Sequence, residues 1–231
     1  MASEVDICNL ALAHLGDSAN VASINPPDSS AQADHCARFY PIARDALIEM
    51  HDWDWTMKRV ALSQVTNVTT EWAYCYAQPT DMINAIAVMS PSAASDNSVG
   101  TTTSAIWAET PMPSGGGSYT PQPFQLELAA DGTEVIYTDV LNAVFRYTAR
   151  VTDTTKFNPL FLDCLSWSLA AMLAGPVLKG DAGMSAAARC TVIAFGQNGT
   201  GGKFARAAVS DSNQKRTTTR DRQSVSWMSA R

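Results

Sequence analysis

Apolar residues repeat with helical spacing near the start of the chain. Ser3 and Asp6 form a capping-box pattern, and apolar residues then follow at intervals of three and four until Gly16. This pattern predicts a helix over 3–15. A second apolar stripe, which runs from Cys36 to Met50, predicts a helix over about 29–52 that is capped by Asp28 or Ser29.

The helical pattern returns in the last third of the chain. Asn158-Pro159 opens a segment that is apolar nearly all round, which predicts a central helix ending at Gly175-Pro176. From Asp181 a further helix is expected, with an apolar side formed by Met184, Ala188, Val192 and Phe195. The glycine-rich run 196–202 interrupts that helix.

Between these helical parts the apolar period changes to two, which is typical of β-strands. Strands are predicted around 60–62 and 72–76, over 82–89, and over 124–128, 135–137 and 143–151. Asp131-Gly132 is a hairpin signal between two of them. Trp53 and Trp55 precede the first strand, at a junction where we expect them to wedge between a helical and a β layer.

These patterns predict an α+β fold in which both chain ends form a helical bundle around an inserted antiparallel β domain. We assign 1–56 and 157–202 to the helical bundle domain and 57–156 to the β domain, which includes a long loop over 90–121. Residues 203–231 are expected to form an extended C-terminal docking tail.

Composition and charge narrow the function classes. The 231 residues are 46% hydrophobic and only 16% charged, so the chain can form a core and leave faces for neighbouring subunits. Residues 1–202 carry a net charge of −11 and residues 203–231 a net charge of +5. An acidic body argues against a nucleic-acid reader, whereas a basic tail is typical of docking segments.

The order of several residue groups resembles a known family. At the N-terminal end these groups are 6–12 with Leu15-Gly16, Ile24 with 27–29, Cys36 with Phe39-Tyr40, Arg44-Asp45 and Trp53. The β part adds 72–76, Pro79 with Asp81, 145–147 and 151–153, and Phe157, Pro159, Leu160 and Phe161 lead into an Ala-rich helix. This ordered set resembles the head-to-tail adaptor proteins of short-tailed bacteriophages, the tail tubular protein A or tail accessory factor family.

The resemblance implies a structural virion protein at the head–tail junction, present in the host cytoplasm during assembly. It implies a homo-oligomeric ring, usually of twelve copies, that binds the portal protein above, closes the DNA-filled head and supports the tail nozzle protein below. Genomic DNA would pass through the lumen without sequence-specific binding. The break at 196–202 and the length of 90–121 depart from the family pattern.

The basic tail is the candidate partner-binding segment, for the portal or for a neighbouring subunit. It can be a solvated end or a segment that orders against a partner. In the second case its cations provide charge and Trp227 provides an apolar anchor. The candidate residues are Lys203, Arg206, Lys215, Arg216, Arg220, Arg222 and Trp227.

Two rival functions come from other classes. Glu49 and Asp52, with Asp54 nearby, could supply the carboxylate pair of a peptidoglycan hydrolase in the tail. Alternatively, Trp72, Tyr74 and Tyr76 could stack on sugars in a carbohydrate-binding tail module. The run Gly196–Lys203 is not a phosphate loop, because its spacing is one residue too long and Phe204 replaces the required Ser or Thr.

No catalytic residue, cofactor or metal site is expected. The five cysteines are widely spaced without a CxxC motif, and His14, His35 and His51 are scattered, so we interpret the cysteines as small buried hydrophobes. The apolar stretch 160–178 contains Asp163 and Pro176 and predicts a buried helix rather than a membrane span.

Overall fold

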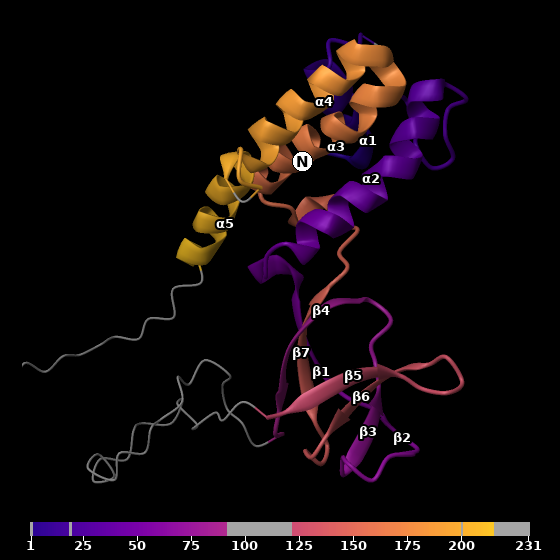
Figure 1. Ribbon diagram of the computed structural model, residues 1–231, viewed down its shortest axis with the longest axis vertical. Coiled ribbons are helices and arrows are strands. Elements are labelled where there is room, and N and C mark those ends of the chain that lie inside the picture. Colours follow the sequence, from indigo (N-terminus) through magenta and orange to yellow (C-terminus); the bar gives the residue numbers. More distant parts are fainter. Residues whose placement is uncertain (1, 19, 92–121, 200, 215–231) are drawn as a thin grey trace, which may run out of the picture. The chain divides into compact units, whose positions relative to one another are not determined.

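The computed structural model describes residues 2–18, 20–91, 122–199 and 201–214 (Figure 1). The chain divides into a helical unit, which comprises Met1–Leu47, Trp53–Trp55 and Thr152–Arg231, and a β unit, which comprises Ile48–Asp52 and Thr56–Val151. The prediction of a mixed α+β protein is therefore confirmed. Compared with the expected boundaries, 152–156 belong to the helical unit and 48–52 to the β unit.

The two N-terminal helices are α1 (Glu4–His14) and α2 (Ala31–Glu49). The capping box of α1 is present, since Ser3 accepts from the Asp6 N–H and Asp6 accepts from the Ser3 N–H. Helix α2 begins later than expected, because Ser30 rather than Asp28 or Ser29 caps it by accepting from Ala33 N–H. Asp28 instead holds Ser30, with its carboxylate 2.6 Å from the Ser30 hydroxyl.

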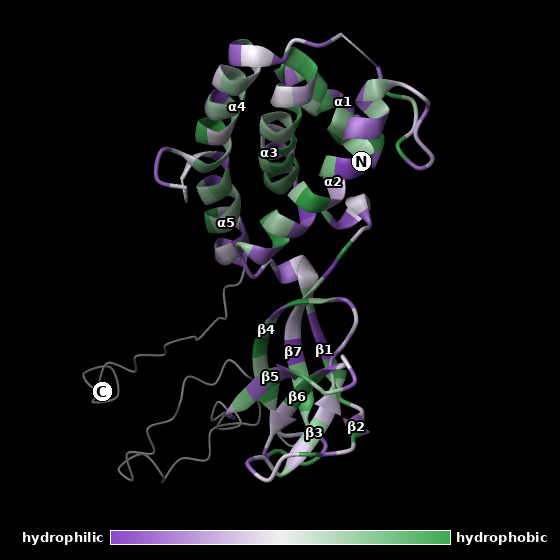
Figure 2. Ribbon diagram, turned by 45° about the vertical axis from the view of Figure 1, so that its right-hand side comes forward, coloured by the Kyte–Doolittle hydropathy of each residue, from purple (hydrophilic) through white to green (hydrophobic). Residues whose placement is uncertain are grey.

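Helix α3 (Pro159–Leu178) is the central helix of this unit and contacts α1, α4 (Gly180–Phe195) and α5 (Gly202–Gln214). Figure 2 shows it as hydrophobic along most of its length. By length and composition α3 could cross a membrane, but half of its most apolar window is buried within the protein. The prediction that α3 ends at Gly175-Pro176 is wrong, since the helix continues to Leu178. It can do so because a proline in the last turn removes only one helical hydrogen bond.

The glycine-rich break at 196–202 is confirmed, but the segment that follows it is a helix and not an extended tail. Phe204, Ala207 and Asp211 of α5 are buried at spacings of three and four residues, which is one helical face. Through the apolar residues of this face, α5 packs on α3 and α4. Residues 215–231 lie outside the described residues.

Short 3-10 helices η1 (Asp54–Thr56) and η2 (Thr154–Lys156) lie near the two places where the chain passes from one unit to the other. Trp53 and Trp55 both pack on the Phe161 ring of α3, at centroid distances of 5.1 and 4.9 Å. Both side chains therefore belong to the aromatic core of the helical unit. The wedge between a helical and a β layer stays a prediction.

The β unit holds seven strands within the described residues, and the short strand β2 is the one that the sequence did not predict. They are β1 (Met57–Ala61), β2 (Gln64–Val65), β3 (Tyr74–Ala77), β4 (Met82–Met89), β5 (Phe124–Leu128), β6 (Glu134–Thr138) and β7 (Val144–Ala149). They form two antiparallel sheets, with orders β1-β7-β4 and β2-β3-β6-β5. The predicted hairpin joins β5 to β6, and Gly132 adopts φ +85°, which glycine permits without strain.

Both sheets contribute to one core within the β unit. Tyr76 and Ile136 from the four-stranded sheet meet Phe145 and Tyr147 of β7 and Val88 of β4. The Tyr76 hydroxyl donates to the Val140 carbonyl at 2.7 Å, which satisfies the one polar group of this buried ring. The alternating residues Cys75, Val135 and Tyr137 form a separate cluster with Trp72 on the opposite face of the four-stranded sheet.

Candidate partner-binding surface

The structure describes two of the seven residues proposed for partner binding. Lys203 and Arg206 lie on α5, whereas Lys215, Arg216, Arg220, Arg222 and Trp227 lie outside the described residues. Arg206 is exposed, as a docking residue would be.

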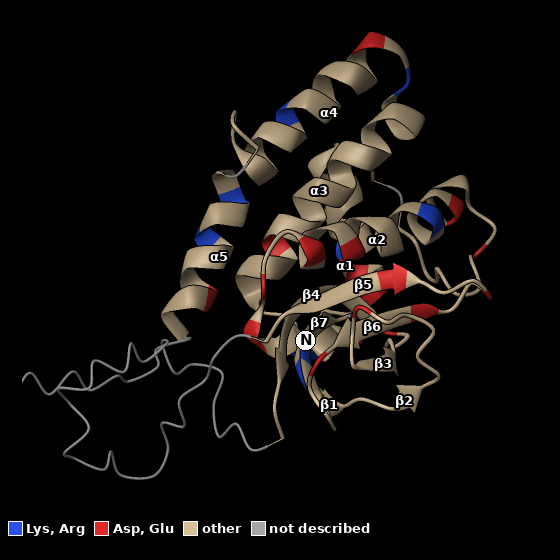
Figure 3. Ribbon diagram, turned by 60° about the horizontal axis from the view of Figure 1, so that its bottom comes forward, with Lys and Arg blue, Asp and Glu red and all other residues tan. Residues whose placement is uncertain are grey.

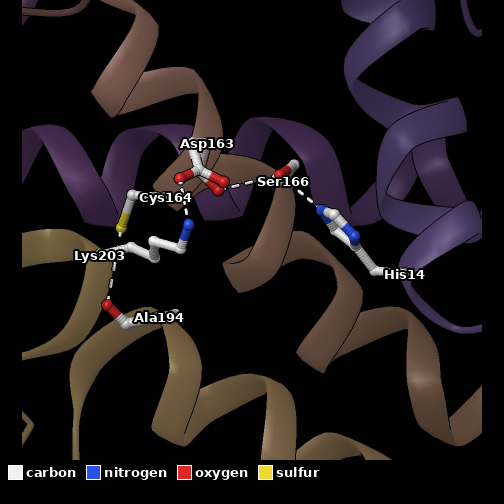
Figure 4. Close-up of polar contacts among 6 residues, drawn as sticks. All are labelled: His14, Asp163, Cys164, Ser166, Ala194 and Lys203. Carbon is white, nitrogen blue, oxygen red and sulfur yellow. Dashed lines mark hydrogen bonds and ion pairs between the residues drawn. The ribbon is translucent and has the colours of Figure 1, made fainter.

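Lys203 is held within the helical unit. Its Nζ lies 2.6 Å from Asp163 Oδ2 on α3 (Figure 4). Because the Asp163 carboxylate already occupies the cation, Lys203 connects α5 to α3 and is not a free charge for a partner. Its role in partner binding stays a prediction, and sequence reasoning missed the ion pair because Asp163 is 40 residues away.

The inner face of α5 is fixed by one aromatic ring and one carboxylate. Phe204 packs edge-on against Trp53 at 6.3 Å and tilted against Phe195 at 6.2 Å. Asp211 is fully buried, and both of its carboxylate oxygens lie 3.3 Å from the Asp54 backbone nitrogen. These contacts anchor both ends of α5.

The outer face of α5 is open. Ala205, Arg206, Val209, Ser210 and Asn213 line a shallow groove along the helix, and Val209 is 60% exposed. An apolar groove beside a guanidinium is suited to a partner that combines apolar and acidic groups.

The outer face of α4 is apolar and also exposed. Met184 and Val192 are 74% and 45% exposed, and Ala188 between them is exposed as well. Of the four residues expected on the apolar side of α4, these three are exposed, whereas Phe195 is half-buried against Phe204 of α5. The buried side instead consists of small residues, namely Gly183, Ala186, Cys190 and Ala194.

Small residues allow α4 to approach α3 closely. A Cβ atom added at Gly183 would lie 2.8 Å from the Ala174 carbonyl oxygen and 3.3 Å from the Gly175 Cα. The apolar stripe on α4 therefore has no function in the core of this unit. We call Met184, Ala188 and Val192 the α4 outer stripe.

A polar cluster links α1 to α3 in the helical unit. His14 Nε2 lies 3.1 Å from the Ser166 hydroxyl, which itself donates to the Asp163 carbonyl at 2.9 Å (Figure 4). The His14 ring stacks on Trp167 with centroids 3.8 Å apart. Burial lowers the pKa of His14; the Asp163 carboxylate opposes this effect and Lys203 adds to it.

This cluster does not have the arrangement of a hydrolytic site. Because the Ser166 hydroxyl proton is directed to a carbonyl, the neutral His14 ring donates its Nε2 proton to the Ser166 oxygen. A ring nitrogen that already carries a proton cannot remove one from the serine, and Ser166 is fully buried. The geometry indicates a structural bridge between the two helices.

Two of the acidic residues of the hydrolase hypothesis make contacts within the fold. Glu49 contributes its backbone carbonyl to Asn84, and Asp52 accepts from Thr148 at 3.2 Å. Asp54 belongs to the helical unit, whereas Glu49 and Asp52 belong to the β unit. Each contact has a role in the fold, which gives the hydrolase hypothesis no support.

The aromatic residues of the carbohydrate hypothesis do not form one exposed platform. Tyr76 is 1% exposed in the β core and Tyr74 packs against that same core. Trp72 packs on the other face of the sheet, against Cys75, Val135 and Tyr137. Sugar stacking requires coplanar, accessible rings on one face, so this hypothesis gains no support either.

In the part of the chain that the structure describes, no group of three or more His, Cys, Asp or Glu residues is placed to hold a metal ion. All five cysteines are free thiols in buried positions, as their interpretation as small hydrophobes predicts. The sequence matches no model of a known protein family and no curated protein.

Proposed function

We propose that this protein is a structural subunit of a phage head-to-tail adaptor ring, present in the virion tail at the head–tail junction. In this proposal the ring binds the portal, helps to close the DNA-filled head and supports the tail nozzle. DNA passes through its lumen at ejection without sequence-specific contacts. The observation that carries the proposal is the α4 outer stripe, which exposes apolar side chains on a helix whose other face is already packed.

An exposed apolar stripe favours an assembly over an isolated enzyme. Burying the side chain of a methionine or a valine contributes about 1.5–3 kcal/mol relative to leaving it exposed. The described residues of the helical unit do not supply this free energy to Met184 and Val192, because its core lies on the other side of α4, and a neighbouring chain can supply it. A head-to-tail contact between subunits produces a closed ring when the rotation that relates one subunit to the next divides a full turn evenly.

Residues behind the family resemblance have structural roles, as expected of a scaffold protein. The Asn9 side chain bonds both the N–H and the C=O of Val21, at 2.8 and 3.0 Å. Asp81 accepts from the Tyr147 hydroxyl at 2.8 Å and pairs with Lys58. These contacts support the proposal because the shared pattern then specifies a fold and not a catalytic site.

Glutamate substitutions in the α4 outer stripe test the proposal. Met184→Glu and Val192→Glu place charges on the presumed contact without disturbing the core face. The matched control is Leu141→Glu, at a β-unit position that is 52% exposed. With the portal protein of the same phage present, light scattering should show multi-subunit complexes for the control and not for the α4 variants. Normal assembly of both α4 variants would overturn the proposed role of this stripe.

A further inference from the structure

The four-stranded sheet of the β unit carries an apolar groove on the face opposite its core. The floor consists of Cys75 and Ala77 from β3 with Val135 and Tyr137 from β6, and the walls include Val65 and Val68. Its volume is about 470 Å³. Val68 is 75% exposed and Val65 37% exposed, so the walls are apolar surface that the described residues do not cover.

The floor of the groove is buried and carries no charged side chain. Cys75 is 1% exposed and Tyr137 2% exposed. Burial raises the pKa of the Cys75 thiol, which keeps it protonated at neutral pH. This environment suits an apolar side chain, and the volume can take a ring as large as that of tryptophan.

The rim of the groove is acidic. Asp131 and Glu134 line one end, and Glu127 on β5 faces the same side because it lies opposite Val135. The described residues of 60–145 include six Asp or Glu and no Lys or Arg, and Figure 3 shows several acidic positions along the strands and loops of the β unit. The sheet therefore presents an unbalanced negative charge around an apolar floor, and the complementary ligand carries cations next to a large apolar group.

The chain itself contains such a ligand. Its C-terminal segment, 215–231, follows the last residue of α5 and holds five Lys or Arg, one Asp and the pair Trp227-Met228. We propose that this segment docks in the groove of the β unit, with Trp227 on the floor and Arg220 and Arg222 at the acidic rim. The inference deepens the subunit contact of the proposed function and rests on it only for the source of the segment, which in a ring is a neighbouring copy.

A photo-crosslinker tests this docking in the full-length chain. Trp227→p-benzoylphenylalanine should crosslink to groove residues within 65–77 or 129–137, whereas the same probe at Thr218, in the same segment, should give little product there. In a mixture of ¹⁵N-labelled and unlabelled chains, mixed-isotope products identify a second copy as the source and single-isotope products identify the same chain. Crosslinks confined to other regions, or to the portal protein, would overturn the proposal.

A charge swap tests the role of the rim. Glu134→Lys should reduce the crosslink yield about threefold, as expected for loss of a surface charge pair, and Arg222→Glu in the same chain should restore it. Glu71→Lys is the matched control, since Glu71 is an exposed acidic residue of the same unit that does not line the groove. Equal yields for Glu134→Lys and the control would contradict the rim contact.

The mass of the assembly is a separate readout in each experiment. If complexes of normal mass form while crosslinks avoid the groove, the docking inference fails and the adaptor proposal stands. If crosslinks reach the groove within single chains and no assembly forms, the adaptor proposal fails and the docking inference stands.

Discussion

The ammonium group of Lys203 lies 2.6 Å from the Asp163 carboxylate and ties the first turn of α5 to the central helix α3. The net charge of the chain changes sign near Lys203, yet this cation serves the helical unit. We therefore place the proposed docking function on the exposed face of α5 and on the segment that follows Gln214.

Removing the Asp211 carboxylate should destabilise the helical unit more than removing the Lys203 charge. Asp211→Ala removes a fully buried carboxylate and leaves the part-buried Asp54 N–H without this acceptor, which costs about 1–3 kcal/mol. Lys203→Met breaks a partly exposed ion pair worth at most about 1 kcal/mol. Chemical denaturation should rank the variants in this order, with Arg206→Gln within about 0.5 kcal/mol of the unmodified chain. The reverse order would mean that Asp211 does not anchor α5.

Two glycines that meet across α3 and α4 should respond oppositely to alanine. A Cβ at Gly183 would lie 2.8 Å from a backbone carbonyl oxygen, and we expect Gly183→Ala to cost about 1–3 kcal/mol. A Cβ at Gly175, inside α3, would meet nothing within 4 Å, so Gly175→Ala should stabilise by about 0.5–1 kcal/mol. Thermal melts of the two variants test this directly, and equal shifts would contradict close packing through small residues.

The pKa of His14 should respond to its two charged neighbours in opposite directions. Lys203→Met should raise it, because that cation disfavours the charged imidazole, and Asp163→Asn should lower it. NMR titration of the ring proton measures both shifts. If both substitutions moved the pKa in the same direction, this electrostatic account would be wrong.

The same group contributes to the pH dependence of stability. Burial lowers the folded-state pKa of His14 below the unfolded value of about 6.5, so folding favours the neutral ring. Its contribution is therefore fully present above pH 6.5 and is lost as the pH falls towards the folded-state pKa. We expect His14→Gln to lose less unfolding free energy than the unmodified chain between pH 7.5 and 5. Equal losses would show that His14 is not the group responsible.

The five cysteine thiols should react slowly with thiol reagents while the chain is folded. All five are buried, and burial, with the nearby Asp163, raises the pKa of the Cys164 thiol to about 12. Because only the thiolate reacts, Ellman's reagent at pH 8 should label the native chain slowly and report five thiols only after denaturation. Rapid labelling of the native chain would show that these sites open readily.

Local signals predicted the local structure well. The Ser3–Asp6 box, the stop at Gly16 and the Asp131-Gly132 hairpin depend on neighbours within a few residues, and each is present. The alternation of apolar and polar residues also predicted strands correctly, because it too depends on neighbours within a few residues. Ser30 replaced Asp28 as the cap of α2 because both residues have capping side chains and their mutual hydrogen bond decides which one faces the helix.

Tertiary contacts account for the failures. Which side of α4 packs on α3 was not predicted, and the structure buries the face of small residues because these allow the closest approach. Helix α5 was missed because its charge dominated the pattern, although Phe204, Ala207 and Asp211 lie at helical spacing. The partner of Asp211 lies 157 residues away, where sequence periodicity gives no information.

The most direct test of the central claim is native mass spectrometry of the full-length chain with and without the portal protein of the same phage. The adaptor account predicts a portal complex that carries a closed set of many copies, twelve if the family pattern holds. A complex with one or two copies, or no complex at all, would contradict it.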